Sequence, residues 1–237
     1  MRQIATYLIL TIFTIIFVNC QQSNNRIIDG QIIEPKGELI AIDFQDSIYD
    51  SLLPLYAKDT VTKDGWSIKY FVKNNSTRYD DIYIQCSKGN LIGIFHGENL
   101  LQYRLYFIPE FVRETNSYIY FTHGCATDCW AILAFSKDNT SKYTDYERVV
   151  DYNLDFEQIL YVTDRSYKNE EDIYDLALVD LKNNKTHSIT YNNLCRSVYK
   201  PSCIDTVIFG QKQVIIKTSL LNIKKEEDTI ETKIIKL

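Results

Sequence analysis

Short runs of alternating apolar and polar residues follow one another along most of the chain. The runs are about five to eight residues long, are rich in Ile, Val, Tyr and Phe, and are separated by clusters of Asn, Asp, Lys and Gly. Alternation with a period of two is typical of strands that bury one face. We therefore predict an all-β chain of repeated antiparallel meanders. The predicted strands are Glu38–Phe44, Trp66–Val72, Asp81–Cys86, Leu91–Phe95, Tyr103–Ile108, Tyr118–Thr122, Trp130–Phe135, Ile159–Thr163, Leu176–Leu181, Thr186–Thr190, Val207–Phe209, Val214–Thr218 and Thr232–Ile235.

Two tight hairpins and the lack of long helices support this interpretation. Ser87–Asn90 and Lys182–Lys185 each join two apolar runs, and their Gly and Asn residues supply the positive φ angles that short hairpins need. The best candidate helix, Asp46–Ala57, is interrupted by Pro54, which has no amide N–H to donate. We predict a single all-β domain over residues 37–237.

Three stretches of the chain share one layout of strand, polar excursion, strand, tight turn and strand. Their anchors Tyr70, Tyr120 and Tyr161 are spaced near the blade period of a β-propeller, about 40 to 50 residues. Residues 159–190 resemble a blade of the TolB-like propellers, and this resemblance implies a small propeller-like domain. A β-sandwich or barrel built from meanders gives the same strand spacing, so it is the alternative.

Composition and charge exclude some classes of partner. Apolar residues make up 45% of the chain, which is enough for a sizeable core, and the net charge is −5. Nucleic-acid binding needs a basic face, and this chain has no cluster of Lys and Arg. We predict no nucleic-acid partner and no docking of the protein surface on anionic lipid.

The first twenty residues differ from all the rest. Arg2 precedes an apolar run from Ala5 to Val18, and Asn19-Cys20 then leads into a polar segment. This layout is typical of a secretory signal peptide, with a cysteine where cleavage is expected. The segment resembles a bacterial lipoprotein signal, which implies that residues 1–19 are removed and that Cys20 is acylated, with palmitate among its chains.

The residues around the expected cleavage point indicate where in the cell the protein is located. Phe17 and Asn19 depart from the strict lipobox, and relaxed boxes of this kind resemble those of one large phylum of Gram-negative bacteria. The resemblance implies a cell-envelope protein held on the outer membrane by its lipid, with residues 20–36 as a lipidated tether and either face possible. Ordinary secretion and a retained anchor are the alternatives, although the apolar run is short for a bilayer, which needs about 20 residues.

Five further cysteines follow, and export makes disulfides the expected state. The sequence-local pairs are Cys125 with Cys129 and Cys195 with Cys203, which leaves Cys86 as the candidate unpaired cysteine. Spacing alone does not decide the connectivity.

His123, Cys125 and Cys129 form the densest group of reactive side chains. Packed or disulfide-bonded cysteines are the favoured interpretation, and a soft-metal site, a redox pair or a thiol nucleophile are the alternatives. None of the usual hydrolase, P-loop or dinucleotide motifs is present. We predict no catalytic residue and no cofactor.

Asp-Ser/Thr-aliphatic triplets recur more often than composition predicts. They resemble O-glycosylation acceptors of envelope proteins in the same phylum of Gram-negative bacteria whose lipoboxes this cleavage motif resembles, although Asp-Ser/Thr pairs also begin strands after turns. The candidate acceptors are Ser47, Ser51, Thr60, Thr206 and Thr229.

The sequence predicts a lipid-anchored binding or structural module without a catalytic centre. The 18 tyrosines could build a surface for a protein or glycan ligand, although most aromatic residues at alternate strand positions pack in cores. The alternative is an envelope enzyme or soft-metal-binding protein that uses His123, Cys125 and Cys129.

Overall fold

The structure is a computed structural model that describes residues 27–31, 38–43, 52–73, 81–97, 105–126, 129–138, 140, 142–163, 173–195, 197, 200–222 and 224–237. Cys20, Ser47 and Ser51 therefore lie outside the described residues. The described strands all pair antiparallel, which confirms the predicted all-β fold. No helix among these residues is long and apolar enough to cross a membrane.

An N-terminal sheet of five strands comes from the first part of the chain. Its order is β2-β4-β5-β6, and β3 pairs with the same edge of β4 as β2 does. Strand β4 alternates as the sequence predicts, with Ile68, Tyr70 and Val72 buried. The strands are β2 (Leu39–Ala41), β3 (Thr60–Val61), β4 (Ser67–Lys73), β5 (Ile82–Lys88) and β6 (Leu91–Gly97), and the short helix α2 (Leu53–Tyr56) precedes β3.

A central sheet has the order β1-β10-β9-β8-β7. Its middle strands are buried on both faces, which explains why their sequences are continuously apolar rather than alternating. The strands are β1 (Ile27–Gln31), β7 (Glu110–Glu114), β8 (Tyr118–Ala126), β9 (Cys129–Ser136) and β10 (Lys142–Glu147), and the 3-10 turn η1 (Leu105–Phe107) precedes β7.

A C-terminal sheet of seven strands follows. It runs β11-β12-β13-β14-β16, and both β15 and the end of β14 pair with one edge of β16 while β17 pairs with the other. The strands are β11 (Val149–Asn153), β12 (Gln158–Val162), β13 (Ile173–Asp180), β14 (Lys185–Leu194), β15 (Ile204–Ile208), β16 (Gln213–Asn222) and β17 (Glu227–Lys236), with the 3-10 turn η3 (Lys200–Cys203) before β15.

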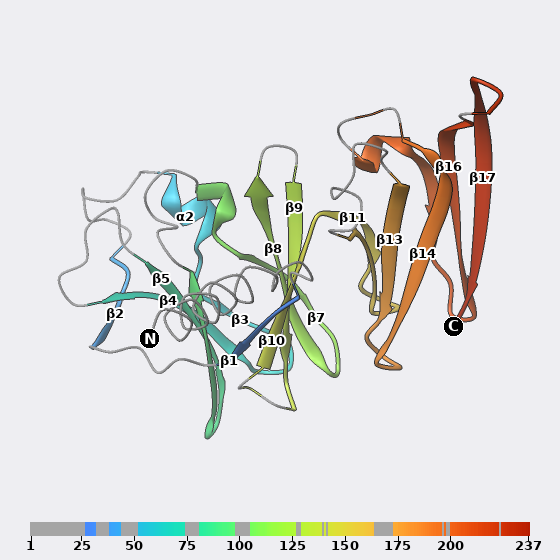
Figure 1. The fold of residues 1–237 in the computed structure, drawn as a ribbon. Coiled ribbons are helices and arrows are strands. Elements are labelled where there is room, and N and C mark those ends of the chain that lie inside the picture. The colour runs from blue at the N-terminus through green and yellow to red at the C-terminus, as the bar shows by residue number, and fades with distance from the viewer. Residues whose placement is uncertain are drawn as a thin grey trace, which may run out of the picture.

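Apart from β1, which joins the central sheet, the strands of the three sheets follow one another in space as they do in the sequence (Figure 1). Phe121 of β8 and Leu133 of β9 share a core with the N-terminal sheet. On the opposite face, Tyr120 and Ile132 share a core with Ile159 of β12. The C-terminal sheet closes around a core of its own that takes side chains from β12 through β16. This curvature fits the barrel alternative.

The two predicted hairpins are confirmed. The turn between β5 and β6 contains Gly89 at φ 58°, and the turn between β13 and β14 contains Asn184 at φ 51°. Gly and Asn adopt this left-handed conformation at low cost, so the sequence placed both turns correctly.

The structure also differs from the sequence predictions. Residues 27–31 fall within the expected tether, yet they pair with β10 as strand β1. The predicted strand Tyr103–Ile108 is wrong, because residues 105–107 form η1. Strands β3, β7, β10 and β11 were not predicted, since they are short or carry many polar residues.

Candidate functional site

The two predicted disulfides are confirmed. Cys125 and Cys129 are joined at the end of the β8–β9 hairpin, with their Cα atoms 5.1 Å apart. Cys195 and Cys203 are joined between β14 and β15, with their Cα atoms 5.8 Å apart. The second bridge thus closes the connection between β14 and β15, both of which pair with β16.

Next to the first disulfide, His123 of β8 reaches Asp145 of β10. Strand β9 lies between them and presents Ala131 opposite His123. Asp145 lies opposite Leu133, two residues along β9 from Ala131, so the two side chains meet diagonally across β9. His123 Nε2 lies 3.0 and 3.1 Å from the two carboxylate oxygens of Asp145. The other ring nitrogen, Nδ1, lies 2.8 Å from the carbonyl oxygen of Gly124.

These partners favour the charged form of His123. Burial alone would lower the pKa of His123, because the imidazolium loses its hydration. The Asp145 charge and hydrogen bond, the Gly124 carbonyl and the charge of Glu147 outweigh burial and raise the pKa of His123 above its ordinary value. The ring therefore donates from both nitrogens, and its first role is to link β8 to β10.

The arrangement limits the metal and nucleophile alternatives for His123, Cys125 and Cys129. Both sulfurs are in a disulfide, and only a thiolate binds a metal or attacks a substrate. Such chemistry would need the bridge to be reduced first. Across the described ranges, no group of three or more His, Cys, Asp or Glu side chains is placed to hold a metal ion.

Cys86 is free and lies fully buried in β5. Burial raises the pKa of its thiol to about 12, so almost none of it ionises near neutral pH. A buried, protonated thiol is chemically inert.

Three candidate glycosylation residues lie within the described chain, each at or near the start of a strand. Thr60 begins β3, and its hydroxyl donates a hydrogen bond to the Lys58 carbonyl at 3.1 Å. Thr206 of β15 is exposed, and Thr229 of β17 is half-buried. The positions agree with the turn-and-strand explanation of these triplets, and glycosylation stays a prediction.

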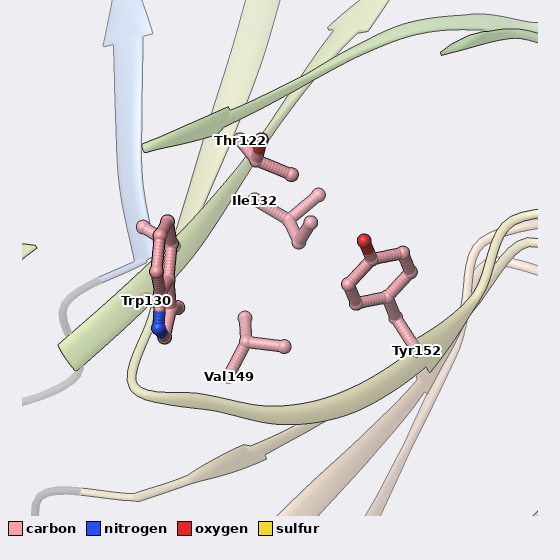
Figure 2. A pocket seen from close by; sticks show the side chains of 6 residues that line it. Thr122, Trp130, Ile132, Val149 and Tyr152 are labelled. Carbon is pink, nitrogen blue, oxygen red and sulfur yellow. The ribbon is translucent and has the colours of Figure 1, made fainter. Parts of the chain in front are cut away.

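A pocket of about 270 Å³ opens where β8 and β9 meet β11. Figure 2 shows the rings of Trp130 and Tyr152 on opposite sides of it, with Ile132 and Val149 between them. Trp130 is 58% exposed and Tyr152 is 40% exposed, so both rings leave apolar surface in solvent beside the core. The lining residues are Thr122, Trp130, Ala131, Ile132, Val149 and Tyr152.

A β-bulge directs Tyr152 into this pocket. The register of β11 against β12 shifts between Val149 and Asp151. Without the extra residue, Val149 and Tyr152 would lie on opposite faces of β11, because side chains alternate along a strand. Just before the strand, Arg148 has φ 58° and turns the chain from the central sheet into the C-terminal sheet. The bulge and this turn together bring both side chains to the pocket.

Sequence reasoning did not find the pocket. Trp130 belongs to a continuous apolar run that predicts a buried strand, and nothing in the run marks one ring as exposed. Tyr152 lies in a strand that was not predicted, and its direction depends on a bulge. Bulges of this type have no residue signature in a single sequence.

No family model, curated protein or solved structure matches this chain.

Proposed function

We propose that this chain is a lipid-anchored protein of the cell envelope that acts as a non-catalytic binding module, and that the Trp130–Tyr152 pocket receives its ligand. The anchor is supported by the layout of residues 1–20, with Cys20 at the expected cleavage point. The binding role is supported by the pocket itself.

The main support for a binding role is that Trp130 and Tyr152 are exposed on either side of the apolar residues Ile132 and Val149, which form the floor of the pocket. Large aromatic side chains left in solvent lose the free energy that burial would give them, about 25 cal/mol per Å² of apolar surface. A ligand that covers Trp130, Tyr152 and the floor residues Ile132 and Val149 recovers that free energy. Pockets that are mostly apolar with a few polar groups are typical ligand sites.

The chemistry of the lining favours an apolar group over a sugar. Ile132 and Val149 offer no hydrogen bonds, and the polar side-chain groups of the lining are the Trp130 Nε1–H and the Thr122 and Tyr152 hydroxyls. A sugar would bury several hydroxyls without partners, which is costly. An aliphatic or aromatic side chain of a peptide partner needs few partners, so we propose a protein ligand that inserts such a side chain.

Tryptophan fluorescence can test this proposal, because the two tryptophans differ in exposure. Trp66 is 3% exposed and Trp130 is 58% exposed, so acrylamide should quench mainly Trp130. Peptides selected from a random display library should shift and protect this emission. In isothermal titration calorimetry, which does not depend on Trp130 as the reporter, Trp130→Ala and Tyr152→Ala should each weaken binding at least tenfold. Leu55→Ala, at an exposed residue of α2, is the control that should bind as the wild type does. Selected peptides that bind all four proteins equally, or a ligand found only on a glycan array, would contradict the proposal.

The anchor has an independent test. Wild-type protein made in a Gram-negative host should incorporate labelled palmitate and partition into the detergent phase. Cys20→Ser should do neither, and its peptide binding should be unchanged. Wild-type protein that stays in the aqueous phase without label would refute the anchor and leave the pocket proposal intact.

A further inference from the structure

Strand β17 forms a long edge of the C-terminal sheet. It pairs with β16 over its whole length, and no other described strand pairs with it (Figure 1). The Leu237 amide donates to the Lys212 carbonyl at 3.1 Å, which fixes the odd-numbered residues as those hydrogen-bonded to β16. The backbone groups of even-numbered residues from Asp228 to Lys236 therefore point outward at the edge.

We infer that two copies of this chain pair through their β17 strands, antiparallel, about a two-fold axis at Thr232. The outward backbone groups of one copy then meet those of the other in a continuous ladder. Two-fold pairing uses the same surface on both copies, so the strand must be complementary to its own reverse.

The side chains of β17 meet that condition. In this register, Asp228 faces Lys236 of the second copy, and Ile230 faces Ile234 of the second copy. On the other face of the strand, Glu231 faces Lys233 of the second copy. Symmetry repeats each contact, so every one of these pairs occurs twice.

Neighbouring registers lack this match. Moving the two-fold axis to Glu231 places that carboxylate against its own copy, and moving it to Lys233 places two ammonium groups together. Directly opposed like charges destabilise a strand pair, whereas opposed unlike charges stabilise it. The charges of β17 thus favour the register centred on Thr232 over its two neighbours.

An apolar row on the outer face of the sheet gives a second reason. Ile208, Ile215 and Ile234 lie opposite one another across β15, β16 and β17. Ile208 is 50% exposed and Ile234 is 57% exposed. Pairing extends this row to Ile230 of the second copy. Ile230 is 71% exposed in the single chain, so Ile234 of one copy and Ile230 of the other cover each other.

Cysteine crosslinking tests the register directly. Paired residues of a hydrogen-bonded antiparallel pair have Cα atoms about 5.5 Å apart, which a disulfide can span. Thr232→Cys in the full chain, held in mild detergent, should form a covalent dimer under mild oxidation. Ile230→Cys is the matched control on the same face of the strand. Its two copies would lie roughly 13 Å apart, so it should not crosslink.

Crosslinking of the two cysteine variants can also contradict the proposed dimer. Wild-type protein, which keeps Cys86 and Cys20, sets the background of crosslinking. Equal crosslinking of Ile230→Cys and Thr232→Cys would refute the register, and no crosslinking of either would refute the dimer.

Charge reversal tests the complementarity. Asp228→Lys and Lys236→Asp should each weaken the dimer at least tenfold in sedimentation equilibrium, because each places two pairs of like charges together. The double variant should restore the wild-type dimer. Circular dichroism and thermal unfolding would verify that the single variants fold. A wild-type chain that stays monomeric at high concentration, or a double variant that is no better than the single ones, would overturn the inference.

Discussion

At the level of single residues, His123 and Asp145 illustrate how burial changes the value of an ion pair. Their side chains are only about a tenth exposed, whereas the second His–Asp pair, His96 with Asp81 at 2.7 Å, is over a quarter exposed on average. Removing one member of a buried pair leaves the other charge without compensation, and water compensates for the same loss at the surface.

We expect Asp145→Asn to lower the free energy of unfolding by about 3 kcal/mol at pH 6, because it leaves a buried imidazolium next to a neutral amide. Asp81→Asn is the matched control and should cost no more than about 1 kcal/mol. Urea unfolding followed by fluorescence measures both. Equal losses in the two variants would contradict the role of burial.

The same pair should make stability depend on pH. The folded pKa of His123 is raised, so its contribution is complete below the unfolded pKa and is lost as pH rises through the folded pKa. The stability difference between wild type and Asp145→Asn should therefore shrink from pH 6 to pH 9. Urea midpoints across this range test the sign, and a difference that grows with pH would contradict it.

At the level of elements, Lys137 ties together three segments that are distant in sequence. It follows β9, and its Nζ lies 2.8 Å from Asp64 Oδ2 in the turn after β3 and 3.0 Å from Glu114 Oε2 at the end of β7. The Lys137 side chain is only 7% exposed. The Lys137 hydrogen bond and charge hold the pKa of Asp64 below its ordinary value. Burial raises the pKa of Glu114, but hydrogen bonds from Thr62, the Asp64 amide and Lys137, together with the Lys137 charge, outweigh burial and lower it.

We expect Lys137→Met to cost about 3 kcal/mol at pH 7, since it leaves Glu114 buried without its cation. A carboxylate with a lowered folded pKa gives stability that is present above its unfolded pKa and lost as pH falls through the folded pKa. The variant should lose less stability than wild type between pH 5 and pH 3. Lys225→Met, which removes an exposed partner of Glu227, is the control and should change little. Parallel acid curves for wild type and Lys137→Met would rule out this role.

The Cys195–Cys203 bridge links the end of β14 to the start of β15, and both strands pair with β16. Cys195→Ala with Cys203→Ala should lower the free energy of unfolding by up to about 2.5 kcal/mol, the value for closing a loop of this length. The shorter Cys125–Cys129 loop should be worth less, about 2 kcal/mol. Calorimetry of the two double variants would compare them. A larger loss from the shorter loop would show that loop entropy does not dominate.

A strand could be predicted from the sequence where its buried side chains are apolar, and was missed where they are polar. Strand β4 alternates and β9 is continuously apolar, so both were found. Strand β10, with the sequence Lys-Tyr-Thr-Asp-Tyr-Glu, was missed because polar residues such as Asp145 occupy inward positions and find partners on other strands. Its burial follows from tertiary contacts, which local pattern does not contain.

The candidate site divides in the same way. Both disulfides were predictable, because the cysteines of each pair are close in sequence and export favours oxidation. The His123–Asp145 contact and the pocket were not, since each joins strands through the register of a sheet. The pocket further depends on the bulge that turns Tyr152.

At the level of the whole molecule, the packing of the N-terminal sheet on the central sheet depends on one glycine. A Cβ atom at Gly93 of β6 would lie 2.3 Å from a Phe135 ring carbon and 2.4 Å from the Thr140 carbonyl oxygen. The missing side chain thus allows β6 to approach the ring closely. The Phe135 ring in turn stacks on Tyr143 of β10.

We expect Gly93→Ala to destabilise the protein by about 1 to 3 kcal/mol, because the backbone contact cannot be relieved by a rotamer change. Ile92→Ala, at the adjacent half-exposed position, is the control and should change stability little. Thermal unfolding measures both variants. Phe135→Leu added to Gly93→Ala should recover part of the loss if the ring is the obstacle, and no recovery would assign the strain to the Thr140 backbone.

The burial of Cys86 affects how the protein keeps its correct disulfides. Each bridge joins cysteines that are neighbours along the chain, so native pairing requires no long-range search. Among the cysteines that the structure describes, Cys86 is the free thiol that could scramble these bridges by exchange, and exchange requires a thiolate that can reach a sulfur. Folding encloses Cys86 in β5 and raises its pKa to about 12. Formation of the core therefore ends reshuffling of the two bridges by Cys86.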